Sequence, residues 1–331
     1  MRSRARRKGE TLNKTKALLA QYNIAIIFIF LVIAASFISA DFFTQRNVTN
    51  VLRQSAVVGI SSMGMLLVIL TRGIDLSVGS VSACGSVFSA YFLSTIPASG
   101  SIAAAIAIGC LMGALSGYLV AARRMPPFVV TLGMMTIARG TAFIVSKGQP
   151  ILVGEKGKIL TDFGKGLTFG VADPVILMLA VFGIVWFLLH FTAFGRLVTA
   201  IGSNEEAVRL SGINIGWYTF ATYVISGGLS ALAGVVNTAR SGVGSPVLGT
   251  GMELDVIAAV VIGGASLMGG RGTALNALLG VLILAVIGNI MNLENVPGYH
   301  QEVVKGVIIL VAVLFQSGLW TGANGATQNK Y

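Results

Sequence analysis

The stretch from Ile102 to Ala122, IAAAIAIGCLMGALSGYLVAA, runs for 21 residues without a charged side chain. A helix needs about 20 apolar residues to cross the hydrocarbon core of a bilayer. The whole chain shares this character: 55% of its 331 residues are hydrophobic and 11% are charged. Soluble domains carry about a quarter of their residues as charged ones. The sequence therefore predicts a polytopic α-helical membrane protein.

Similar uncharged runs recur along the rest of the chain and give about ten candidate spans. They are Asn23–Ala40, Ala56–Leu70, Ser80–Ile96, Ile102–Ala122, Phe128–Val145, Val175–Phe191, Tyr218–Thr238, Leu254–Met268, Thr273–Met291 and Val303–Gly318. The second and eighth are short and end in glycine-rich breaks, which leaves the count open by one or two. We expect one all-α transmembrane domain over residues 21–319, after a basic segment (1–20) and before a short tail (320–331).

Positive charge predicts the orientation of these spans. Seven basic residues precede the first span: Arg2, Arg4, Arg6, Arg7, Lys8, Lys14 and Lys16. Because Lys and Arg accumulate in cytoplasmic segments, the N-terminus is expected in the cytosol. Ten spans then place Arg123–Arg124, Arg196–Arg209, Arg271 and the tail (320–331) on the same side, and the loop of about 147–173 outside. The net charge of +11 follows from this topology, so no nucleic-acid partner is expected.

A compact polar stretch, SNEEAVRLSG from Ser203 to Gly212, lies between two long apolar segments. The pair Ser203 and Glu206 fits the capping box that begins a helix. Gly212 supplies the matching stop, because glycine tolerates the left-handed conformation that often ends one. A separately capped cytosolic helix in a membrane protein is best explained as a docking element for another protein.

Two glycine-punctuated segments resemble each other across the chain, GIDLSVG at Gly73–Gly79 and GASLMGG at Gly264–Gly270. Interrupted segments at matching places in two halves indicate internal duplication and a transport route. Asp75 and Ser266 are suited to cap the helix that restarts after each break. One interpretation is a pair of hinges beside the pathway, and the other is an ordinary tight turn at the cytosolic face. The hinge candidates are Gly73, Asp75, Ser77, Gly79, Gly264, Ser266, Gly269 and Gly270.

Several polar residues fall within or beside the spans. Arg139 is an intramembrane charge, which marks either a functional site or a side chain that snorkels or bonds carbonyl groups near a break. Asn289 and Asn292 share a helix face near the exterior, and Gln54 and Ser55 begin the second span. These four are candidate contacts for a polyol substrate, although helix capping explains the asparagines equally well. Glu302 and Lys305 are spaced for a helical ion pair, so Lys305 is expected to be structural.

The chain lacks the patterns of an enzyme or a metal protein. It contains no Ser/His/Asp or paired-carboxylate constellation, so no catalytic residue is expected. Cys84 and Cys110 fall within spans, and His190 and His300 are isolated, so neither a disulfide framework nor a metal site is expected. The segment Gly154–Lys158 lacks the spacing of a phosphate-binding loop.

Taken together, these motifs resemble the permease subunits of bacterial ABC sugar importers, the family that takes up ribose, xylose, arabinose, galactosides and autoinducer-2. The resemblance runs from about residue 40 to 316 and is densest with the ribose-type permeases. It is carried by FFT at Phe42–Thr44, GIDLSVGS at Gly73–Ser80, NEEAVRLSGIN at Asn204–Asn214, LDVIAAVVIGG at Leu254–Gly264 and HQEVVKGVIILVAVL at His300–Leu314.

The resemblance implies a role for the polar helix. Permeases of this kind carry a coupling helix, often marked E-A-A-x-x-x-G, that sits in a groove on an ATPase. Glu206, Ala207 and Gly212 keep that spacing, with Val208 in place of the second alanine. Ser203, Glu205 and Arg209 complete the set expected to face the ATPase or to brace the helix.

The resemblance also implies the surroundings of the chain. The expected partners are an ABC ATPase subunit, a periplasmic sugar-binding protein, a second permease chain in a homodimer or heterodimer, and the lipid of the bacterial inner membrane. ATP and Mg are expected in the ATPase, so this chain is a transport pore without a cofactor or an enzymatic activity of its own.

Three alternatives remain open at this point. An ABC permease for another sugar, autoinducer-2, a branched-chain amino acid or a nucleoside would share most of these motifs. A secondary symporter would need a membrane carboxylate or another titratable pair to bind its coupling ion. A passive channel would not need the polar helix. Neither the carried sugar nor the resting conformation follows from the residues.

Overall fold

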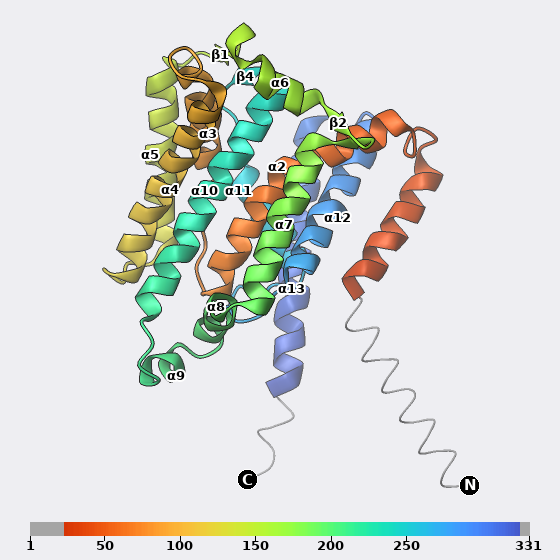
Figure 1. Ribbon diagram of the computed structural model, residues 1–331. Coiled ribbons are helices and arrows are strands. Elements are labelled where there is room, and N and C mark those ends of the chain that lie inside the picture. The colour runs from red at the N-terminus through yellow and green to blue at the C-terminus, as the bar shows by residue number, and fades with distance from the viewer. Residues whose placement is uncertain (1–22, 325–331) are drawn as a thin grey trace, which may run out of the picture.

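Long apolar helices that run between two ends of the molecule make up most of the chain (Figure 1). The computed structural model describes residues 23–324, with side chains for residues 23–314. The predicted basic segment 1–20 and the last part of the tail 320–331 lie outside the described residues. Helix α13 continues to Asn324, so the start of that predicted tail is helical.

Each predicted span overlaps a helix, although the eighth, Leu254–Met268, extends past the end of α11 into a loop. These helices are Asn23–Ile38, α2 (Gln45–Leu70), α3 (Val78–Phe92), α4 (Ala98–Ala121), α5 (Pro127–Ser146), α7 (Asp173–Phe191), α10 (Ile215–Ser241), α11 (Met252–Ile262), α12 (Ala274–Leu293) and α13 (Gly298–Asn324). Among the described residues, six are long and apolar enough to cross a membrane: α2, α4, α5, α7, α10 and α12. The prediction of a polytopic helical protein is confirmed. Of the ten predicted membrane spans, six correspond to helices that are long and apolar enough to cross a membrane.

Short polar side chains determine where several helices begin. A side-chain oxygen of the residue before the helix accepts a backbone N–H of the first turn at α2, α8 (Ala193–Ser203), α9 (Glu205–Leu210), α10 and α12; the caps are Thr44, Thr192, Asn204, Asn214 and Thr273. Such caps satisfy N–H groups that have no partner within the helix.

Helix α2 is the centre of the bundle. Every residue from Gly59 to Leu70 is buried, as expected for a helix that is apolar on all sides. It packs against α7, α10, α11 and α12, while α10 also packs against α3 and α4. The main core cluster therefore surrounds α2, with Ile60, Leu66 and Leu67 fully buried.

The bundle contains two short helices that begin inside it. α3 has 15 residues and α11 has 11, so at 1.5 Å per residue neither spans the roughly 30 Å of a bilayer core. Their N-terminal regions meet: a Cβ on Gly79 would lie 2.3 Å from the carbonyl oxygen of Gly249. From this meeting point α3 leads to the end with α6, and α11 to the end with α8 and α9 (Figure 1).

The two glycine-rich segments, Gly73–Gly79 and Gly264–Gly270, have different neighbours in the structure. The partner of Gly73–Gly79 in space is the segment 242–251, which connects α10 to α11, because Gly79 contacts Gly249. Gly264–Gly270 is instead a loop between α11 and α12, and its Gly270 N–H donates to the carbonyl of Leu70 at 3.0 Å. The two similar sequences therefore pack against different parts of the bundle.

The long loop that the sequence places outside folds over one end of the bundle, the upper end in Figure 1. It contains β1 (Ile151–Leu152), η1 (Glu155–Gly157), α6 (Lys158–Lys165), β2 (Leu167–Thr168) and β3 (Val171–Ala172). β1 pairs antiparallel with β4 (Val243–Gly244), and β2 pairs with β3. Helices α8 and α9 lie at the opposite, lower end.

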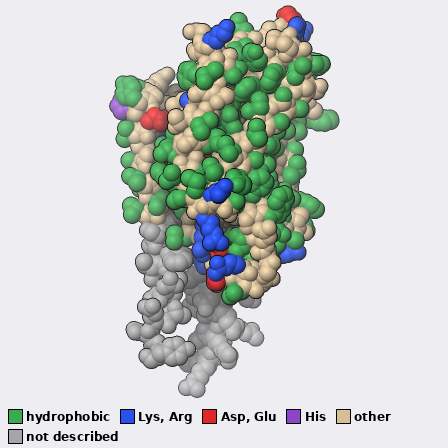
Figure 2. Space-filling view, turned by 90° about the vertical axis from the view of Figure 1, so that its left-hand side faces the viewer, with side chains coloured by type: hydrophobic (Ala, Val, Ile, Leu, Met, Phe, Trp, Pro, Cys, Tyr) green, Lys and Arg blue, Asp and Glu red, His purple; other side chains and the backbone are tan. Residues whose placement is uncertain are grey.

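Charged side chains follow the same division into ends. Figure 2 shows hydrophobic side chains across the middle of one face, with Lys and Arg mainly at its upper edge and in its lower part. This distribution fits a chain whose middle lies in lipid and whose ends reach the two aqueous sides.

Candidate functional site

The polar stretch predicted to dock a partner forms the six-residue helix α9 at the lower end. Its cap is Asn204, whose Oδ1 accepts the Ala207 N–H at 3.0 Å. The prediction that Ser203 caps this helix is wrong: α8 continues through Ser203, whose hydroxyl donates to the Thr199 carbonyl at 2.9 Å. Gly212 has φ +76°, which confirms the left-handed stop.

Helix α9 presents charged and apolar side chains to the outside. Glu206 and Arg209 form an ion pair with side chains about three-fifths exposed (59% and 58%). The hydrogen bond and charge of Glu206 raise the pKa of Arg209, so this guanidinium stays charged. Leu210, which the sequence analysis did not single out, is 79% exposed, whereas Val208 is buried and holds the helix against its own chain. The outward apolar contact is therefore offered by Leu210 rather than by Val208.

Arg72 connects α9 to the centre of the bundle. Its Nε donates to the carbonyl of Gly202 at 2.8 Å and its Nη2 to that of Ser203 at 3.2 Å, at the end of α8. Arg72 lies two residues after the end of α2 and has φ +66°. The loop at Gly269 and Gly270 packs on the same place. We call the contact of Arg72 with Gly202 and Ser203 the Arg72 joint; nothing in the sequence pattern indicated it.

The first glycine-rich segment is held by a buried carboxylate. Asp75 Oδ1 accepts the N–H and the hydroxyl of Ser77, at 3.0 and 2.6 Å, and Oδ2 accepts the hydroxyl of Ser226 in α10 at 2.8 Å. Asp75 thus closes a turn before α3. The prediction that Asp75 caps this helix is wrong, because the residue before α3 is Ser77. A Cβ on Gly73 would lie 2.5 Å from the hydroxyl of Tyr223, so this position also packs on α10.

Ser266 does not cap the helix that follows it either. Its hydroxyl accepts the N–H of Met268 at 3.2 Å, within the loop. The cap of α12 is Thr273, seven residues later, which accepts the Asn276 N–H at 3.2 Å. The loop needs glycine, because Gly264, Gly269 and Gly270 all have positive φ, at +81°, +82° and +71°.

Arg139 bonds carbonyl groups near a break. Its Nη1 donates to the carbonyls of Pro246 and Leu248, at 2.7 and 2.6 Å. Both acceptors belong to the segment 242–251 that precedes α11. This confirms the second of the two interpretations, in which the guanidinium satisfies carbonyls that have no helical partner.

The four candidate substrate contacts line one cavity of about 510 Å³ between α2, α11, α12 and α13. Gln54 and Ser55 come from α2, and Asn289 and Asn292 from α12. Asn289 exchanges two amide hydrogen bonds with Asn47, at 2.9 and 2.7 Å, which joins the upper ends of α2 and α12. The Ser55 hydroxyl donates to the carbonyl of Val51 at 2.7 Å, within its own helix.

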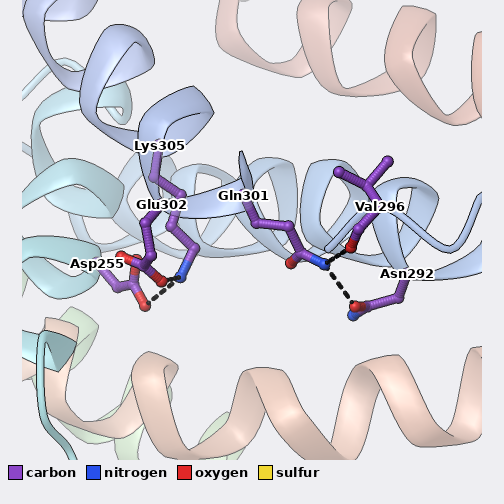
Figure 3. A network of polar contacts seen from close by, with 6 residues as sticks. All are labelled: Asp255, Asn292, Val296, Gln301, Glu302 and Lys305. Atoms are coloured by element: carbon purple, nitrogen blue, oxygen red, sulfur yellow. Dashed lines mark hydrogen bonds and ion pairs between the residues drawn. The ribbon is translucent and has the colours of Figure 1, made fainter. Parts of the chain in front are cut away.

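An ion pair lies at the same cavity. Lys305 Nζ is 3.2 Å from a carboxylate oxygen of Asp255 and 3.3 Å from one of Glu302. Figure 3 shows Lys305 and Glu302 on α13 turned toward Asp255 of α11, and Gln301 turned toward Asn292. The predicted pair of Glu302 and Lys305 is confirmed. Asp255 was missed, because an isolated carboxylate in an apolar run carries no sign of a partner 50 residues away.

Comparisons with known proteins find matches that cover most of the chain. A family model described as "Branched-chain amino acid transport system / permease component" matches residues 47–313. The ribose import permease protein RbsC of Escherichia coli (strain K12) is 43% identical over 303 residues, which cover 91% of this chain and 94% of that protein.

Relatives with lower sequence identity are named for other sugars. The L-arabinose ABC transporter permease protein AraH of Azospirillum brasilense is 35% identical, with 90% of this chain and 88% of that protein covered. The fructose import permease protein FrcC of Rhizobium meliloti is 36% identical, with 83% and 79% covered. No solved structure matches the chain.

Proposed function

The chain belongs to the family of branched-chain amino acid transport system permease components, and from this premise we propose that it is the membrane subunit of an ATP-driven importer of ribose. The observation that carries the proposal is the 43% identity with a ribose import permease, which extends over 91% of the chain. The chain is a transport component rather than an enzyme. We place it in the bacterial inner membrane, with the N-terminus and the lower end in the cytosol.

Helix α9 is the element proposed to receive the force of ATP hydrolysis. It is separately capped, lies at the lower end and presents Glu206, Arg209 and Leu210 outward. In this proposal Glu205, Glu206, Ala207, Arg209 and Gly212 form or shape the surface that enters a groove on the ATPase, and Val208 anchors it from behind. ATP and Mg²⁺ are bound by that partner.

Movement of α9 would reach the bundle through the Arg72 joint. Arg72 bonds the end of α8 and directly precedes the segment Gly73–Gly79, which we propose as a hinge together with the loop Gly264–Gly270. A movement couples to transport only if these contacts differ in free energy between the inward-open and outward-open states.

We propose a position for each of the remaining partners. The loop 147–173 at the upper end is where a periplasmic binding protein would deliver the sugar. A second permease chain, identical or related, would complete the pathway within the membrane.

A secondary symporter is the second candidate. The ion pair of Asp255 and Lys305 supplies a titratable pair inside the bundle, the feature that such a protein uses to bind its coupling ion. The two functions differ in energy source. Uptake that persists with ATP after the proton gradient is collapsed supports the importer, and uptake that stops with the gradient contradicts it.

A co-purification experiment tests the role of α9. We expect the wild-type chain in detergent to bind the ATPase encoded beside it and to stimulate ATP turnover. Glu206→Arg and Gly212→Pro should fold but lose both effects, because one reverses a surface charge and the other replaces a glycine at φ +76°. Lys158→Glu, which changes an exposed charge at the upper end, is the matched control. Equal binding by all variants would overturn the docking role.

A further inference from the structure

The cavity between α2, α11, α12 and α13 is lined by many polar side chains. Amide side chains line it from three sides: Asn47, Asn50 and Gln54 on α2, Asn289 and Asn292 on α12, and Gln301 on α13. Polar groups at membrane depth are costly unless they meet protein, water or a solute. The cavity is therefore a polar compartment and not a surface for acyl chains.

Part of this hydrogen-bonding capacity is unused within the described part of the chain. Gln301 Nε2 donates to Asn292 Oδ1 and to the Val296 carbonyl, both at 2.9 Å, which leaves the Gln301 oxygen and the Asn292 amino group available. Asn50 and Gln54 also line the cavity, and no hydrogen bond of their side chains is seen among residues 23–314. Carboxamides offer donors and acceptors together, which matches the hydroxyl groups of a polyol.

The two charged side chains that line the cavity have opposite charges. Lys305 and Asp255 both line it and lie 3.2 Å apart, so they present a neutral pair. Glu302 completes the cluster from the outside, with a side chain 68% exposed. An anion would meet Asp255 and a cation would meet Lys305 without a free counter-charge, whereas an uncharged solute meets only dipoles. The wall thus discriminates by charge.

Size and position fit a small solute that enters from the upper end. The volume of about 510 Å³ lies within the roughly 300–1,000 Å³ typical of small-molecule pockets. Asn47, Asn50, Asn289 and Asn292 lie near the upper ends of α2 and α12. Asp255 lies in the first turn of α11, which begins inside the bundle. The ion pair of Asp255 and Lys305 therefore forms the inner wall.

We propose that this cavity is a weak binding site for an uncharged sugar or polyol of pentose size, entered from the upper end and closed inward by Lys305 and Asp255. The proposal rests on the proposed function and extends it by placing a solute site in the permease itself. Affinity is expected to be weak, because the amides are partly paired with one another and a transport site must release its solute.

Direct binding to the assembled permease and ATPase in detergent, without the binding protein, tests the site. Saturation-transfer NMR with ribose, ribitol and ribonate compares two uncharged solutes with an anion of the same length. We expect ribose and ribitol to bind and ribonate not to bind. Equal binding of ribonate would overturn the charge argument.

Two substitutions replace carboxamides that line the cavity with apolar side chains of similar size. The double variant Gln54→Leu/Asn292→Leu should weaken ribose binding about tenfold or more, since it removes two hydrogen-bonding side chains. Gln149→Leu, an exposed carboxamide in the upper-end loop, is the matched control. Unchanged binding in the double variant overturns the proposal, as does loss of subunit co-purification, which would identify the face as a subunit contact.

A charge exchange tests the inner wall. Asp255→Lys and Lys305→Asp should each lower ATP-driven ribose uptake at least tenfold, and the double exchange should recover most of it. Uptake equal to that of the wild type in all three variants would contradict the role of the pair. Uptake by the double exchange as low as that of each single variant would also contradict it. If wild-type uptake itself does not require ATP, the proposed function fails, and that result is independent of the binding measurements.

Discussion

Gly79 shows how one missing side chain determines the position of two helices. The N-terminal regions of α3 and α11 meet where Gly79 and Gly249 lie against each other, with each hypothetical Cβ within 2.5 Å of the other residue's carbonyl oxygen. Gly249 also has φ +67°, which side chains disfavour. Close approach of backbones, rather than flexibility, explains these glycines.

Gly79→Ala is therefore expected to destabilise the protein. The added methyl group has backbone as its nearest neighbour and cannot be relieved by rotation, so we expect a loss of about 1–3 kcal/mol. Thermal unfolding in detergent, followed by tryptophan fluorescence, measures it. Gly133→Ala in α5 is the control, because its Cβ would meet nothing within 4 Å. A transition temperature for Gly79→Ala equal to that of Gly133→Ala would contradict the close contact.

The contacts of other residues could be predicted from the sequence only where both partners lie close together in the chain. Glu302 and Lys305 are three positions apart on one helix, and their pairing followed from spacing. Asp255 and Arg72 bond groups 50 and 130 or more positions away, which no local pattern reveals. The four candidate substrate contacts were chosen singly, and only the fold brings them to one cavity.

Among the elements, α9 has a cap that the sequence misplaced by one residue. Ser203 and Asn204 are both good caps, and the sequence does not choose between them. The choice follows from α8, which continues through Ser203 and uses its hydroxyl within that helix. Asn204 then takes the extended conformation, φ −154° and ψ 91°, that begins α9.

Alanine substitutions at Asn204 and Ser203 distinguish the two possible caps of α9. Asn204→Ala should destabilise α9 by about 1 kcal/mol, since the Ala207 N–H loses its acceptor. Ser203→Ala should leave α9 nearly unchanged. Amide hydrogen exchange of residues 205–210 measures both, and the order of the two variants decides. Faster exchange in Ser203→Ala than in Asn204→Ala would restore the serine cap.

The spans were predictable as elements, but their relations were not. Uncharged length identifies a helix because lipid penalises every charge. The correspondence of Gly73–Gly79 with Gly264–Gly270 was predicted from similar sequences, whereas the segment that Gly73–Gly79 contacts, 242–251, has a different sequence. Breaks are matched by where helices start in space, and that depends on contacts such as Gly79 with Gly249.

On the scale of the whole molecule, the Arg72 joint lies between the lower end and the enclosed helix α2. Three segments meet there: the end of α2, the end of α8 and the loop at Gly269 and Gly270. Because α2 contacts helices on every side, a displacement at this joint reaches much of the bundle.

Arg72→Leu should uncouple ATP turnover from uptake. The variant loses two hydrogen bonds to backbone carbonyls but leaves the surface of α9 intact, so the ATPase should still co-purify and turn over ATP. We expect uptake per ATP to fall roughly two- to thirtyfold, the range of mutational effects on coupling. Arg271→Leu, an exposed arginine in the neighbouring loop, is the control. An unchanged ratio would show that the joint transmits nothing.

The pairing of Asn47 with Asn289 has a consequence for biosynthesis. The two residues are 242 positions apart, and at 5–20 residues per second a ribosome needs roughly 12–50 s between them. During that time α2 has been made without α12, and Asn47 lacks the two hydrogen bonds to Asn289. The central helix is thus complete well before α12, and the upper side of the cavity between them can close only when the second half of the chain has been made.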